Sequence, residues 1–134
     1  MSQNHDDISR RADKAYGSGN FDLARSLYLQ LVELPPAASI ANYKLSLLEL
    51  ADGNERVAVS YARLAAESNP PVPEYWVNYI RLSVDAGRTV EAKEAIDKAQ
   101  LAGFVGNDFF AEALLQIGIQ EYNDKNFEGA LISA

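Results

Sequence analysis

Apolar and small side chains recur along this chain at the spacing of amphipathic helices. One stretch places them at i, i+3, i+4, i+7 and i+8, a single face of an α-helix; its residues are Trp76, Tyr79, Ile80, Ser83 and Val84. A second stretch has the same spacing with smaller side chains, which let two helices approach closely; they are Ala92, Ala95, Ile96 and Ala99. No segment alternates with the period of two that predicts a half-buried strand. The pattern therefore predicts an all-α fold.

The helical pattern repeats every 34 residues. A glycine followed by a turn residue occurs three times, and an alanine stands five positions after each; the pairs are Gly19 and Ala24, Gly53 and Ala58, and Gly87 and Ala92. Pro36 and Pro70 repeat the same step. A fourth copy, Lys125-Asn126-Phe127 with Ala130, is displaced by four further residues, which fits an insertion in the stretch 103–107. Each repeat is thus predicted to hold two helices around a turn, where glycine supplies the left-handed conformation that ends the first helix.

These positions resemble the tetratricopeptide repeat (TPR) family over nearly the whole chain. The residues that carry the resemblance are Ala12, Ala24, Tyr28 and Pro36 in repeat one, Leu45, Ala58, Ala65 and Pro70 in repeat two, Trp76, Ala92 and Ala99 in repeat three, and Gly118 and Ala130 in repeat four. Leu31 and Ile80 depart from the family, which has small residues at both positions. The resemblance implies a right-handed superhelical array of antiparallel helix pairs, a TPR solenoid, in one domain over 1–134. It implies three full repeats, 5–38, 39–72 and 73–110, and a partial fourth, 111–134.

In this family the first helices of successive repeats line a concave groove that binds a peptide or protein segment. The resemblance therefore implies a non-catalytic protein–protein interaction module. The groove positions carried over to this chain are Tyr43, Lys44, Leu47 and Leu50 in repeat two, Asn78 and Arg81 in repeat three, and Leu115, Gln116 and Ile119 in repeat four. One interpretation is an apolar groove with a polar ladder, in which the Asn78 amide holds a peptide backbone. The other is that the leucines contact neighbouring helices and the polar groups are solvated.

Composition removes several classes of function. The formal net charge is −7, whereas a nucleic-acid binder needs a basic face. The absence of cysteine excludes disulfides, zinc fingers and thiol catalysis. The chain has one histidine, His5, so a Ser/His/Asp triad could be formed only with this residue near the N-terminus. His5 with Asp6 and Asp7 lacks the number and spacing of metal ligands. We therefore expect no enzyme activity, no cofactor and no metal.

No signal peptide and no membrane-spanning stretch is visible, so we expect a cytoplasmic protein without a membrane partner. The sequence stops within repeat four, and we expect it to be the N-terminal piece of a longer protein. An uncapped last repeat also predicts self-association through that end. Two other functions stay open. One is a substrate-recruiting or oligomerising N-terminal region of a larger enzyme, such as a bacterial glycosyltransferase or other group transferase. The other is a small secretion chaperone.

Overall fold

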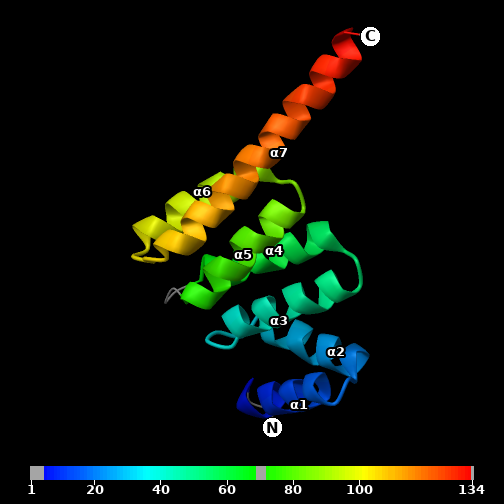
Figure 1. Ribbon diagram of the computed structural model, residues 1–134. Helices are drawn as coiled ribbons and strands as arrows, with labels where there is room; N and C mark the ends of the chain where they lie inside the picture. The colour runs from blue at the N-terminus through cyan, green and yellow to red at the C-terminus, as the bar shows by residue number, and fades with distance from the viewer. Residues whose placement is uncertain (1–4, 69–71, 134) are drawn as a thin grey trace. The chain divides into compact units, whose positions relative to one another are not determined.

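The structure is a computed structural model that describes residues 5–68 and 72–133, with side chains described over 6–68 and 72–126. Within these ranges every regular element is a helix (Figure 1): α1 (His5–Gly17), α2 (Phe21–Leu31), α3 (Ala38–Ala51), α4 (Glu55–Ala66), α5 (Pro73–Asp85), α6 (Thr89–Leu101) and α7 (Asn107–Ser133). The prediction of an all-α fold is confirmed for the described residues.

The chain forms two compact units, residues 1–75 and residues 76–134, which divide within α5. In the N-terminal unit α1 packs against α2, α2 against α3, and α3 against α4. In the C-terminal unit α6 packs against α7. Tyr79 also links the body of α5 to α6, because its hydroxyl donates a hydrogen bond of 2.8 Å to the Glu91 carboxylate. Helices that follow one another along the chain therefore pack together from α1 to α4 and from α6 to α7.

The core of the N-terminal unit combines alanines with a few large side chains. Ala12, Ala24 and Ala41 are fully buried, which allows close contact between helices. Tyr28 is buried as well, and its hydroxyl donates a hydrogen bond of 2.6 Å to Asp13 on α1. Burial raises the pKa of Tyr28, and the hydrogen bond to Asp13 raises it further. Leu31, where the TPR pattern has alanine, is fully buried in the same cluster.

The three glycine turns have the same backbone geometry. Gly19, Gly53 and Gly87 have φ values of +82°, +82° and +73°. The residue after each glycine donates its N–H to a carbonyl five positions back, at 2.8 to 2.9 Å; the pairs are Asn20 to Ala15, Asn54 to Glu49, and Arg88 to Ser83. This bond and the left-handed glycine define the Schellman motif, which satisfies carbonyls at a helix C-terminus. The predicted 34-residue repetition of the turn is thus confirmed at the level of backbone hydrogen bonds.

The connections between repeats are less regular. Pro35-Pro36, joined by a cis peptide bond, lies between α2 and α3. Pro73 begins α5, a position where the missing N–H of proline costs no helical bond. The predicted boundary at Pro70-Pro71 lies outside the described residues. The predicted insertion at 103–107 is a connector between α6 and α7, with Gly103 at a φ of +94°.

The predicted turn of repeat four at Lys125-Asn126-Phe127 is wrong, because α7 continues through it as one helix to Ser133. In the other three repeats a glycine with positive φ stands at this place. Lysine pays a steric penalty in that conformation, since its Cβ approaches the backbone. It is instead a good helix former, so the helix runs on. The side chains of Phe127 and Ala130 lie outside the described residues.

Candidate functional site

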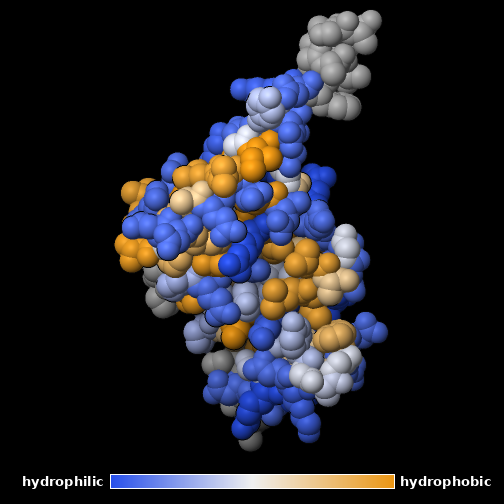
Figure 2. All heavy atoms as spheres, in the orientation of Figure 1, coloured by the Kyte–Doolittle hydropathy of each residue, from blue (hydrophilic) through white to orange (hydrophobic). Residues whose placement is uncertain are grey.

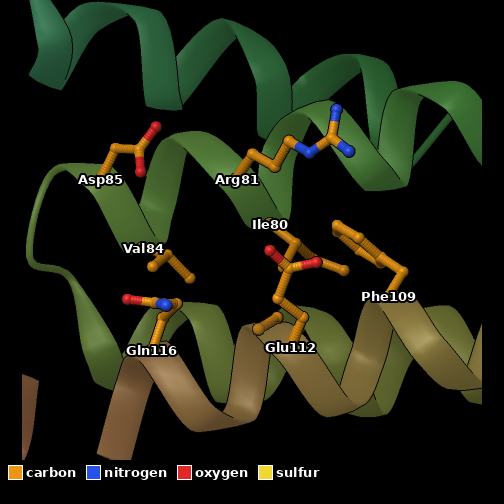
Figure 3. A pocket seen from close by; sticks show the side chains of 8 residues that line it. Ile80, Arg81, Val84, Asp85, Phe109, Glu112 and Gln116 are labelled. Carbon is orange, nitrogen blue, oxygen red and sulfur yellow. The ribbon is translucent and has the colours of Figure 1, made fainter. Parts of the chain in front are cut away.

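A cavity of about 300 Å³ lies in the C-terminal unit between α5 and α7. Its lining comes from Ile80, Arg81, Val84 and Asp85 on α5 and from Phe109, Glu112, Ala113 and Gln116 on α7. Ile80 and Val84 extend toward α7, while Phe109, Glu112 and Gln116 extend toward α5 (Figure 3). Ile80 is fully buried and Ala113 is buried, whereas Arg81, Asp85, Glu112 and Gln116 are exposed. The cavity therefore has an apolar floor and a polar rim.

Arg81 is held at one end of this cavity by an aromatic ring. Its guanidinium carbon lies 5.4 Å from the centre of the Phe109 ring, within the range of a cation–π interaction. Phe109 is itself supported by two further rings, with centroids 6.5 Å away at Phe104 and 6.0 Å away at Phe110. Phe110 is buried, so this aromatic cluster anchors the start of α7. The Arg81 charge is thereby placed beside a fixed ring.

The rim carries two carboxylates, one on each helix. Asp85 lies one turn after Arg81 on α5, and Glu112 lies one turn after Phe109 on α7. Gln116, a further turn along α7, adds an amide that can both donate and accept hydrogen bonds. The rim therefore bears two negative charges and one positive charge.

Of the predicted groove residues in the C-terminal unit, Arg81 and Gln116 line this cavity. Asn78 is partly buried on α5 and is not among the lining residues. Leu115 and Ile119 lie on α7 outside the lining and are 61% and 46% exposed. Their exposure leaves them free to meet another molecule.

Two of the predicted residues of the N-terminal unit, Tyr43 and Lys44, contact other side chains of that unit. The Tyr43 ring stacks on Tyr75 with centroids 4.8 Å apart, and the Tyr43 hydroxyl donates a 3.0 Å hydrogen bond to Glu74. Burial and this hydrogen bond raise the pKa of Tyr43 to about 12. The Lys44 ammonium lies 4.8 Å from the centre of the Tyr16 ring. For Tyr43 and Lys44 the structure therefore favours contacts with neighbouring helices.

The other two predicted residues on α3 differ from each other in exposure. Leu47 is partly buried, while Leu50 is 39% exposed. Leu50 is thus the most exposed of the four predicted residues on α3.

The residues predicted for the groove do not include the two carboxylates and the aromatic ring that shape the cavity. Asp85 follows Arg81 by four positions, which is the helical spacing that could have identified it. Phe109 precedes the predicted start of repeat four at 111, because the insertion shifts the register there. Glu112 lies just after that start. Its place in the cavity lining depends on which side of α7 faces α5, and the sequence pattern does not give that orientation.

Neither a metal site nor a membrane span is found in the described part of the chain. No group of three or more histidine, cysteine, aspartate or glutamate side chains comes together there. No helix described over 5–68 and 72–133 combines the length and the apolar character that crossing a membrane requires.

No protein-family model matches this sequence, and no curated protein matches it.

Proposed function

We propose that this chain is a helical-repeat protein of the TPR type whose first helices bind a peptide segment of a protein partner without catalysis. The cavity between α5 and α7 carries the proposal, because these helices fall at the predicted first-helix positions of repeats three and four. An apolar floor with a few polar groups at the rim is the usual composition of a binding pocket. Helix faces of this kind accept the side chains of a docked segment while polar groups hold its backbone.

The repeat assignment is supported by two ion pairs at equivalent positions. Arg25 Nε on α2 lies 3.5 Å from Glu49 Oε1 on α3, and Lys93 Nζ on α6 lies 2.8 Å from Glu121 Oε2 on α7. Arg25 and Lys93 lie 68 positions apart, which is twice 34, and the two glutamates differ by 72, which adds the four-residue insertion. In both pairs the second helix of one repeat contacts the first helix of the next. This is the contact through which stacked repeats bury their faces.

Filling the cavity is expected to weaken peptide binding. Gln116→Trp places a large ring at the rim, whereas Gln100→Trp makes the same change at an exposed position on α6, a second helix. Peptides selected from a displayed random library against the unaltered chain are expected to lose at least about tenfold in affinity for the first variant, the equivalent of 1.4 kcal/mol. They should bind the second variant unchanged. Titration calorimetry measures the affinities, and circular dichroism checks that both variants keep their helix content.

Two results would contradict this proposal. One is a library selection that yields no binding peptide. The other is a set of selected peptides that bind both tryptophan variants as tightly as the unaltered chain, since such peptides would contact another surface.

The alternative of an oligomerising region is favoured by the exposed face of α7. Leu114 stands at the repeat position of Asn42 and Trp76, which are 8% and 4% exposed, yet it is 47% exposed itself. Gly118 is likewise exposed, while Ser46 and Ile80 at its repeat position are fully buried. Hydrophobic side chains are visible on the surface over α6 and the neighbouring part of α7 (Figure 2). A face that is buried in two repeats and open in a third is suited to a helix from another chain.

Self-association through this face is expected to depend on Leu114. The unaltered chain should gain apparent mass with concentration in light scattering, and Leu114→Glu should suppress that gain by burying a charge in the contact. Leu101→Glu, at a residue 88% exposed at the end of α6, provides the control and should leave association unchanged. A constant monomer mass for the unaltered chain would contradict the alternative.

A further inference from the structure

We propose that the α5–α7 cavity accepts a lysine or arginine side chain of the partner segment, so that this site selects basic peptides. The inference rests on the proposed function and names the chemistry of its ligand. Three features of the cavity support it: the charge of the rim, the shape of the floor and the position of Arg81.

The rim charges favour a cation. Within the described residues neither Asp85 nor Glu112 forms an ion pair, although both line the cavity. Arg81 is the cation of the lining, and it is placed over the Phe109 ring at one end. A ligand cation in the cavity would meet two carboxylates of the lining against one guanidinium, whereas a ligand carboxylate would meet two like charges. Like-charge contacts of this kind exclude the wrong partner.

The floor suits a long side chain with a charged end. Ile80, Val84 and Ala113 supply apolar surface below the rim. Lysine has a flexible four-carbon stem and arginine a similar one, so either can bury methylene groups while its charged head stays near water. A volume of about 300 Å³ lies at the lower end of the range for ligand pockets, which fits one side chain. A fully apolar side chain of that length would displace water from the carboxylates without offering them a hydrogen-bond donor or a positive charge in its place.

The charge of the whole chain acts in the same direction. A formal net charge of −7 draws basic segments toward the surface over distances limited by salt screening. Contacts at the rim then determine which side chain enters. We therefore expect binding to weaken as the salt concentration rises.

The test titrates isotope-labelled full chain with three probes: N-acetyl-lysine methylamide, N-acetyl-norleucine methylamide and N-acetyl-glutamate methylamide. Norleucine keeps the four-carbon stem and lacks the charge. The lysine probe is expected to shift amide resonances of Val84, Glu112 and Gln116 by NMR, more strongly than either other probe. The double variant Asp85→Asn with Glu112→Gln should weaken lysine binding about fivefold, because each exposed ion pair contributes modestly. The matched double variant Glu94→Gln with Asp97→Asn, at exposed residues of α6, should not.

The outcomes separate this inference from the proposed function. If selected peptides bind and respond to Gln116→Trp, but the cavity prefers norleucine or glutamate, the proposed function stands and this inference is overturned. Equal lysine binding by the two double variants also overturns it. If no peptide binds the chain at all, the proposed function fails, whatever the amino-acid probes do.

Discussion

Replacing Leu31 with alanine is expected to destabilise the N-terminal unit by about 3 kcal/mol, although alanine is the residue that the TPR pattern has at this position. Leu31 is fully buried, in one cluster with Leu27, Tyr28 and Leu45. Truncation removes three carbon atoms, a methine and two methyl groups, from the core and leaves a cavity that rigid helices fill only in part. The resemblance to a family would suggest a neutral change, so the packing and the family pattern predict opposite results here.

Urea denaturation followed by circular dichroism measures this change. Leu64→Ala provides the matched control, because Leu64 is 50% exposed on α4 and its loss should cost less than about 0.5 kcal/mol. A loss at Leu31 no larger than the loss at Leu64 would show that the helices close around the smaller side chain, and the burial argument would fail.

The helices and their glycine turns could be predicted from the sequence because both are set locally. Periodic apolar positions such as Trp76, Tyr79 and Ile80 mark one face of a helix, and all three are buried. Gly53 marks a helix end because it takes a conformation that other residues avoid. Repetition every 34 residues then added weight to each single signal. No long-range contact was needed for these predictions.

The candidate site depended on contacts that the sequence does not encode locally. Tyr43 and Lys44 were expected in a groove, but each is engaged with a ring on another helix, Tyr75 and Tyr16. The role of Phe109 beside Arg81 depends on how α7 faces α5 after the insertion. The repeat register predicts a turn at Lys125, although lysine stands there in place of the glycine found in the other turns, and α7 continues through this position instead. The 34-residue spacing therefore locates the repeats in the sequence, whereas the contacts of each side chain depend on which residue stands at each position and on how the helices pack.

Replacing Gly53 with valine is expected to destabilise the N-terminal unit by about 2 kcal/mol through backbone strain alone. Gly53 has a φ of +82°, and nothing lies within 4 Å of where its Cβ would be. A Cβ at this position would therefore meet no neighbouring side chain, and the main expected cost is that of holding a β-branched residue in the left-handed region. The turn cannot relax without losing the 2.9 Å hydrogen bond from Asn54 N to Glu49 O.

Gly118→Val separates this cause from a general intolerance of larger side chains. Gly118 also has open space around it, but it lies within α7 and its φ is not positive. Glycine costs a helix interior about 1 kcal/mol relative to alanine, and valine costs less than glycine. The same substitution should therefore leave stability unchanged or raise it by up to about 0.5 kcal/mol. Urea midpoints for both variants, compared at equal helix content, test the pair. If Gly53→Val and Gly118→Val had the same effect, the left-handed turn could not be what ends α3, and the physical basis of the 34-residue repeat would be lost with it.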